Sequence, residues 1–488
     1  MRIVLNPHAA YLLPLAAAMS AGAAHAAAEA PLADHIVAVK VSGHDVLSRN
    51  TPFVDVTVCN TRGKCKTVSN VMVDTGSTGL RMVRGAVEEL HLDPVTDAAG
   101  QPLANWGRAS LSDLWGPVHW AKVQIGKVTT QRAIPIQVFD LPTDGELVPA
   151  GYGRVDKRKL MGFRCNGVLG IGPQRHVDTG YYRWEEGSNS WLWKSPSQWV
   201  AQGVDRTRQL VNPIARFPAP YNNGSVLSMP AVDWNTGAER VRGLLGLGIG
   251  EPTDRLFESG RRVLSHDFND KSQFPAVLGG RRVELTARTS TSGMTLDLAH
   301  LGIPRHASSP KLYDAKVPTV IDLTVPHAGE YVRLARPLYV GPTVDYVAAH
   351  PGHGVLPMIV GAPDRPGEPN VLGMPFYYGR TVATGLAGTV NPFAQGRAVN
   401  SKPVAAAPFS GPLGVHIIDD HVDRLMSIED DEDIEIIDDE VQIVGGTKLI
   451  DDYVKPARAP APAPVVEDDF VEYSVSPNGY IAYTDSSL

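Results

Sequence analysis

The stretch that decides the fold reads Val71-Met72-Val73-Asp74-Thr75-Gly76-Ser77-Thr78-Gly79-Leu80. Its leading apolar residues predict a buried strand that carries one carboxylate, Asp74, into a tight turn. Thr75 can hydrogen-bond within that turn, and Gly76 supplies backbone freedom that a residue with a Cβ lacks. Ser77 completes the turn. The first interpretation is that Asp74 is a functional carboxylate. The second is that it only caps an ordinary strand–turn, which the bare Asp-Thr-Gly triplet would also fit, so the rest of the sequence must decide between them.

Two further apolar strands that end in glycine support the first interpretation. One contains Val168-Leu169-Gly170, and its Gly170 follows Asp74 by 96 residues; the other contains Val371-Leu372-Gly373. Together with the Asp74 turn they resemble the duplicated signatures of pepsin-type aspartic peptidases. That resemblance implies an all-β, bilobed double β-barrel with an interlobe cleft, an N-terminal lobe over residues 36–205 and a C-terminal lobe over 206–392. A core strand whose glycine only allows close packing against a neighbouring strand would show the same sequence pattern.

Pepsin-type chemistry needs a second aspartate, because one carboxylate activates water while the other protonates the carbonyl. The second half contains neither Asp-Thr-Gly nor Asp-Ser-Gly, and its best match is Thr295-Leu296-Asp297-Leu298-Ala299-His300-Leu301-Gly302-Ile303. We therefore predict Asp297 as the partner of Asp74, in a degenerate turn. Leu298 lacks the hydroxyl that ties the two turns together in this superfamily. The rival Asp322 lies only 51 residues before Gly373, which is too short a spacing.

Three functions remain open on this sequence. The first is an aspartic endopeptidase that activates water between Asp74 and Asp297, with no metal and no organic cofactor. The second is a catalytically degenerate binding or scaffold protein that holds a peptide or protein in the cleft. The third is a retroviral-type dimer in which Asp74 from two chains meet, although the visible second lobe favours a monomer. No nucleic acid is expected as a partner.

The N-terminus predicts export to the periplasm or the exterior. Residues 1–26 read as a signal peptide, with a short apolar stretch and an Ala-x-Ala end at Ala24-His25-Ala26. The apolar stretch is too short to remain as a membrane span. An oxidising compartment favours a disulfide between Cys59 and Cys65 across a turn-rich loop, and their spacing argues against zinc. Cys165 is left over, and a buried free thiol is the commoner state for it.

The charge is distributed unevenly along the chain. Residues from Gly396 onward contain 19 acidic and 6 basic side chains, which gives this segment a net charge of −13. Because the net charge of the whole chain is −7, the residues before Gly396 carry a net charge of +6. Pro and Ala dominate parts of the same segment. These features predict a tail over residues 393–488 that is largely disordered or binds a partner through its acidic run.

The chain also resembles a family of bacterial exported proteins of unknown function that carry V-D-T-G-S-S-G-L-R-type motifs. The shared features are Val73 to Arg81, Cys59 with Cys65, the run from Cys165 to Pro173, and Gly379-Arg380-Thr381-Val382. The second turn in that family usually looks like Asp-Ser-Gly-Ser, from which Asp297 in Asp-Leu-Ala-His departs. This resemblance implies the fold and export, and brings no established activity.

Overall fold

The computed structural model describes residues 32–42, 49–109, 112–139, 165–184, 199–201, 203–253, 256, 264–268, 273–327, 330–334, 336–363, 370–389, 413–418, 472–475 and 481–484. The predicted signal peptide lies outside these residues. All the elements below belong to one compact unit, Ala33–Leu488. Within the described ranges, no helix is both long and apolar enough to cross a membrane.

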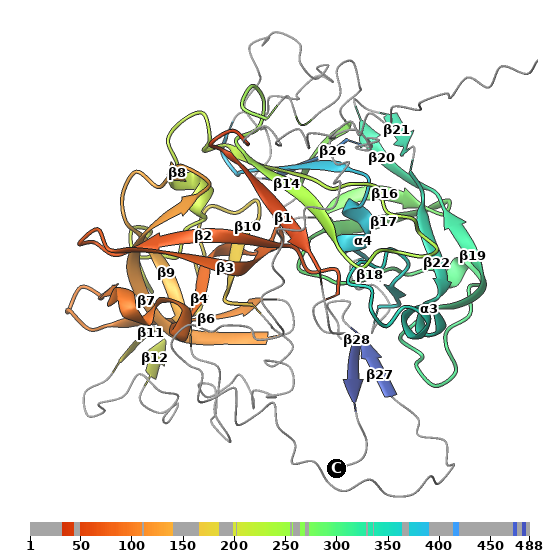
Figure 1. Cartoon of the computed structure of the whole chain (residues 1–488), viewed down its shortest axis with the longest axis horizontal. Helices are drawn as coiled ribbons and strands as arrows, with labels where there is room; N and C mark the ends of the chain where they lie inside the picture. The colour runs from red at the N-terminus through yellow and green to blue at the C-terminus, as the bar shows by residue number, and fades with distance from the viewer. Residues whose placement is uncertain are drawn as a thin grey trace, which may run out of the picture. The chain divides into compact units, whose positions relative to one another are not determined.

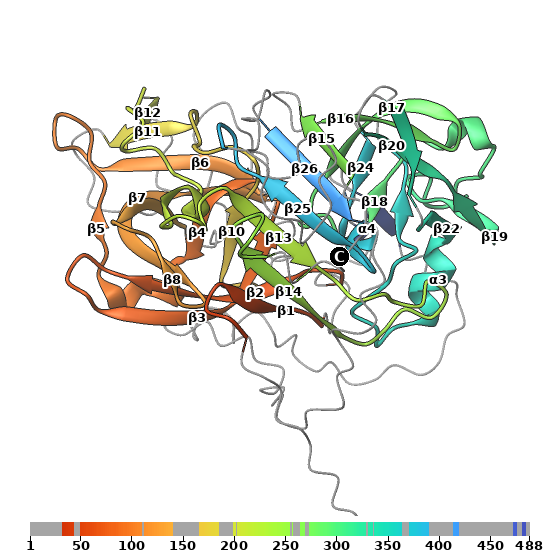
Figure 2. The same ribbon diagram turned by 90° about the horizontal axis from the view of Figure 1, so that it is seen from above.

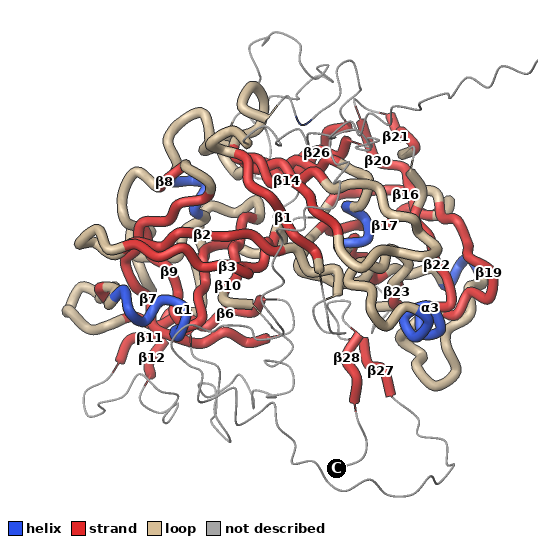
Figure 3. Tube along the Cα trace, viewed as in Figure 1, coloured by secondary structure: helices blue, strands red, loops and turns tan. Residues whose placement is uncertain are grey.

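Strands dominate the structure, and the few helices are short (Figure 3). The strands of the first half are β1 Ile36–Val41, β2 Phe53–Cys59, β3 Cys65–Asp74, β4 Thr78–Val83, β5 Asp93–Pro94, β6 Leu103–Ala109, β7 Ser112–Ile125, β8 Val128–Thr129, β9 Ile134–Phe139, β10 Gly167–Ile171, β11 Tyr181–Trp184 and β12 Trp199–Ala201. Those of the second half and beyond are β13 Gly224–Ser228, β14 Val241–Leu247, β15 Leu264–Phe268, β16 Phe274–Leu278, β17 Arg281–Ala287, β18 Met294–Thr295, β19 Asp314–Ile321, β20 Leu323–His327, β21 Glu330–Arg333, β22 Leu338–Pro342, β23 Val360–Gly361, β24 Asn370–Leu372, β25 Thr381–Gly385, β26 Leu413–Ile418, β27 Glu472–Val475 and β28 Ile481–Thr484. The helical segments are α1 Arg84–Val87, η1 Glu88–Leu90, η3 Pro213–Arg216, η5 Ala299–Leu301, α3 Thr343–Ala349 and α4 Met374–Tyr377.

Six strands of the first half close into a barrel (Figure 1). The pairings run β2–β3–β10–β4–β9–β7 and return to β2. Strand β2 shows why these residues form strands: Val54, Val56 and Val58 are at most 3% exposed, whereas Asp55 between them is exposed. This period of two buries one face of the strand in the barrel core.

The second half repeats the central part of this pattern. Strand β16 pairs with β17 as β2 pairs with β3, and β24 runs parallel to β17 as β10 runs parallel to β3. Strand β18 then pairs antiparallel with β24 and parallel with β23, as β4 pairs with β10 and β9. The all-β, duplicated pepsin-like fold predicted from the sequence is therefore confirmed.

A further sheet draws on both ends of the chain. Its order is β1–β14–β13–β25–β26–β15, and Figure 2 shows β25 and β26 side by side. Strand β26 lies within the segment 393–488 that the sequence predicts as largely disordered, and so does the β27–β28 hairpin. These strands differ from that expectation; the rest of the tail lies outside the described residues.

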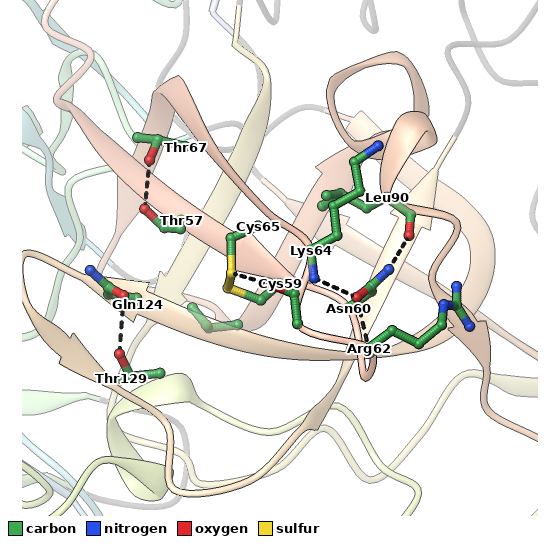
Figure 4. Close-up of a disulfide and its surroundings, with 12 residues drawn as sticks. Thr57, Cys59, Asn60, Arg62, Lys64, Cys65, Thr67, Leu90, Gln124 and Thr129 are labelled. Atoms are coloured by element: carbon green, nitrogen blue, oxygen red, sulfur yellow. Dashed lines mark hydrogen bonds between the residues drawn. A yellow bond between two sulfur atoms is a disulfide. The ribbon is translucent and has the colours of Figure 1, made fainter.

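The predicted disulfide is present. Cys59 and Cys65 are joined across the turn between β2 and β3 (Figure 4). Asn60 organises the same turn: its Oδ1 accepts hydrogen bonds from the backbone N–H of Arg62 (3.0 Å) and Lys64 (2.9 Å), and its Nδ2 donates to Leu90 O. Cys165 is a buried free thiol as expected, and burial raises its pKa to about 12.

Replacing Cys59 and Cys65 together by alanine should lower the free energy of unfolding by about 2 kcal/mol, since the bridge closes a loop of only about seven residues. Chemical denaturation of the oxidised protein and the double variant measures the difference. Reduction should bring the wild type to the level of the variant and leave the variant unchanged. Equal stability of oxidised and reduced wild type would contradict a stabilising role for this bridge.

Candidate functional site

The Asp74 turn lies at the end of β3, as the sequence predicts. Val71 and Val73 are fully buried, and Asp74 is only 1% exposed. The carboxylate Oδ1 of Asp74 accepts a hydrogen bond from the backbone N–H of Gly76 at 2.8 Å. The turn then leads into β4 through Gly79, whose φ of +91° is a left-handed conformation that favours glycine.

Strand β10 threads beside this turn. It pairs parallel with β3, so that Gly170 lies opposite Asp74, and antiparallel with β4, so that Gly170 also lies opposite Gly79. A Cβ at position 170 would lie 2.7 Å from Gly79 O and 2.8 Å from the Thr78 backbone. The predicted motif glycine is thus required by close approach of two backbones.

The equivalent turn of the second half begins with an arginine. Strand β24 runs parallel to β17 with Ala287 opposite Leu372, and the next backbone N–H, that of Arg288, donates to Leu372 O at 3.0 Å. Gly373 follows, and a Cβ on it would lie 1.9 Å from Gly293 O. Arg288 and Gly373 in the second half therefore correspond to Asp74 and Gly170 in the first.

Reciprocal threonine contacts connect the two turns. The Thr75 backbone N–H donates to Thr289 Oγ1 (3.2 Å), and the Thr289 backbone N–H donates to Thr75 Oγ1 (3.1 Å). The Thr289 hydroxyl also donates to Val73 O at 2.6 Å. Thr75 and Thr289 are 4% and 1% exposed, so every one of these bonds is buried. We call this contact between the turns at 74–76 and 288–290 the seam.

Asp297 does not take part in the seam. Its carboxylate forms a 3.2 Å ion pair with Arg281, and its backbone N–H donates to Asn370 Oδ1 at 2.5 Å, both within the second half. The register explains the difference from our expectation. Thr295 lies opposite Val371 on β24 as Arg81 lies opposite Val168 on β10, so Asp297 corresponds to Val83, nine residues beyond the Asp74 position.

The Arg288 side chain packs over the Asp74 turn. A Cβ on Gly76 would lie 2.7 Å from Arg288 Cβ and 2.9 Å from Arg288 Cδ, so the side chain crosses this exposed glycine. Arg288 is half-buried, and its Nε is buried without a hydrogen-bond partner among the described residues. No ion pair of Arg288 occurs within the same residues.

The hydroxyl of Tyr377 lies close enough to Asp74 and Arg288 for both charges to shift its pKa. Its hydroxyl lies 3.1 Å from Thr75 Oγ1. Burial raises the pKa of Tyr377, the hydrogen bond to Thr75 lowers it, Asp74 raises it further and Arg288 lowers it. The carboxylate and the guanidinium are therefore both within electrostatic reach of one buried hydroxyl. The Ser77 Oγ is also buried without a partner among the described residues.

A second arginine lies behind the Asp74 turn. Arg81 on β4 is 3% exposed, and its guanidinium donates to Asn105 Oδ1 (3.0 Å) and to Gln137 Oε1. Burial lowers the pKa of Arg81 to about 10, while Tyr181 and Asp74 act in the opposite direction. At neutral pH this residue keeps its charge, so Asp74 has a buried cation on one side in addition to Arg288.

Within the described ranges, no group of three or more His, Cys, Asp or Glu side chains is placed to hold a metal ion. The sequence analysis missed Arg288 and Thr289. A usable signal exists in Leu285-Thr286-Ala287-Arg288-Thr289, which keeps the strand pattern and the threonine of Val71-Met72-Val73-Asp74-Thr75 at a constant offset of 214 residues.

A family model described as Protein of unknown function (DUF3443) matches residues 31–400. No curated protein matches significantly. Among solved structures, the crystal structure of aspartic proteinase from Irpex lacteus aligns over 79% of this chain and 98% of that chain, with 12% sequence identity and a TM-score of 0.43.

Proposed function

The chain belongs to the family described as Protein of unknown function (DUF3443), and because that description names no activity, we propose from the geometry of the seam that it is an exported pepsin-like protein that binds peptides without cleaving them. The observation that carries this proposal is Arg288. It stands in the duplicated turn where a pepsin-type peptidase requires its second aspartate.

An arginine in place of the second aspartate removes the acid–base chemistry that two neighbouring carboxylates would perform. Two close carboxylates can share a proton, so that one acts as base and the other as acid. A guanidinium stays protonated at every relevant pH and has no lone pair to accept a proton. Asp297, the sequence-based candidate for the second carboxylate, is held by Arg281 instead. This arrangement supports the binding function over the peptidase.

The same contacts count against a dimeric peptidase. In a retroviral-type dimer, the turn of a second chain would have to meet Thr75. Here Thr289 of the same chain occupies that place through two backbone-to-hydroxyl hydrogen bonds. The seam is thus completed within one chain.

A cleavage assay tests the proposal directly. Unfolded casein incubated with the protein between about pH 3 and 8 should show no cleavage above buffer, since a working acid–base pair would have an optimum in that range. The Asp74→Asn variant should be equally inactive. It should still retain peptides from a separate tryptic digest of casein, measured by mass spectrometry after capture, because Asn keeps an acceptor oxygen. Cleavage that Asp74→Asn or a statine-type inhibitor abolishes would overturn the proposal.

Export forms part of the proposal and rests on residues 1–26 and on the disulfide between Cys59 and Cys65. N-terminal sequencing of the mature protein checks it, with Ala27 as the expected first residue. A mature protein that still begins at Met1 in the cytoplasm would contradict it.

A further inference from the structure

Arg288 offers unused hydrogen-bonding capacity at the seam. Two other arginines of the second half are paired with carboxylates: Arg281 with Asp297 and Arg333 with Asp322. Arg288 has no such ion pair within the described residues, although its Nε is buried. An unsatisfied donor costs free energy when it is removed from water, and a ligand acceptor would recover that cost.

The Arg288 side chain is partly exposed to solvent beside an exposed turn. Gly76, over which the side chain passes, is exposed and carries no side chain of its own. The Asp74 carboxylate lies across the same turn, with Oδ1 already accepting from Gly76. The seam thus places a partly exposed guanidinium and the buried Asp74 carboxylate near one another, both within electrostatic reach of Tyr377.

These two charges select among anions. A guanidinium matches a planar carboxylate through two parallel N–H···O bonds. Phosphate can also bind a guanidinium, but it has no N–H group to donate to Asp74. Asp74 can in addition accept a hydrogen bond from an N–H group of the ligand. The ligand should therefore combine one carboxylate with a nearby N–H donor.

A peptide C-terminus combines both groups within one residue. Building on the peptide-binding function proposed above, we propose that the seam is a site for the C-terminal residue of a peptide, with Arg288 binding the free carboxylate and Asp74 accepting the backbone N–H. An Asp or Glu side chain also carries a carboxylate, but it places the N–H farther away along a flexible stem.

Peptide capture distinguishes these sources. The mature exported protein is immobilised and incubated with a randomised octapeptide library that has free carboxyl termini. In parallel, it is incubated with the same library carrying C-terminal amides. The retained peptides are quantified by mass spectrometry. We expect the free-acid library to be retained at least about tenfold more, which corresponds to about 1.4 kcal/mol. Retention that depends on internal Asp or Glu and survives amidation would overturn the C-terminal assignment.

Variants identify the residue responsible. Arg288→Gln should reduce retention of the free-acid library by at least about tenfold, and Arg288→Lys should restore part of it, because lysine keeps the charge without the fork. Arg281→Gln, which removes an arginine of the same half, should leave retention unchanged. Equal retention by Arg288→Gln and Arg281→Gln would overturn this inference while leaving peptide binding in place. Failure to retain either library, or cleavage of either, would instead overturn the proposed function.

Discussion

Gly373→Ala is expected to lower the free energy of unfolding by at least about 3 kcal/mol. The reason is steric, because the φ of Gly373 is −82° and any residue can adopt it. A Cβ on this glycine would lie 1.9 Å from Gly293 O and 2.5 Å from Thr291 O. Both atoms belong to the backbone between the Arg288 turn and β18, so relief of the clash requires β24 to separate from that segment. Urea or guanidinium denaturation of the purified variant measures the loss.

Alanine substitutions at two other glycines should lower stability by smaller amounts and serve for comparison. Gly170→Ala should cost less than Gly373→Ala, since its closest backbone atom would lie 2.7 Å away. Gly352→Ala in the second half meets nothing within 4 Å and should change stability by no more than about 0.5 kcal/mol. If Gly373→Ala fails to accumulate, the Gly170 variant still tests the argument. Equal stabilities of the three variants would show that the close approach of the backbones is not tight.

Thr289→Val should destabilise the protein by about 3 kcal/mol. Valine has a similar shape but leaves the Thr75 N–H without an acceptor and Val73 O without a donor. Each buried group that loses its partner costs about 1–3 kcal/mol. Thr75→Val should act similarly, since it deprives the Thr289 N–H and the Tyr377 hydroxyl of a partner.

A double-mutant cycle isolates the contact between the two turns. The Thr75→Val/Thr289→Val protein should lose less stability than the two single losses together, with a coupling of about 1–3 kcal/mol, because the first loss already lets the turns separate and lets water reach the groups that the second loss would leave unpaired. Thr67→Val provides the control, because its hydroxyl lies 2.8 Å from the Thr57 hydroxyl in an exposed pair of the first half. This control should change stability by no more than about 0.5 kcal/mol. Additive losses at Thr75 and Thr289 would show that the two turns are not energetically coupled.

Local features of the site were predictable from the sequence. The Asp74 turn needs only an apolar run followed by a turn triplet, and the bridge between Cys59 and Cys65 spans a short loop. The motif glycines 170 and 373 were also found, because an apolar strand that ends in glycine is a compact signal.

The partner of the Asp74 turn was not predictable in the same way. A second aspartate was expected, and Asp297 retains the acid but not the register, whereas Arg288, which was not considered, retains the register but not the acid. Hydroxyl residues such as Thr289 and Ser290 are common on surfaces, so nothing local marks them as buried. Their burial arises from contact with a turn 214 residues earlier, and only strand pairing reveals it.

The separation between Thr75 and Thr289 also bears on how the molecule forms. The hydrogen bonds between them close a loop of 214 residues, and β1 near the N-terminus pairs with β14 from the second half. Contacts so distant in sequence raise the contact order, and chains of high contact order fold slowly because loop entropy is lost before the contacts form. Until the second half emerges during synthesis, the Thr75 amide has no acceptor from its own chain. In a nascent first half the Asp74 turn would therefore lack its partner turn, which makes the order of chain emergence part of the folding of this protein.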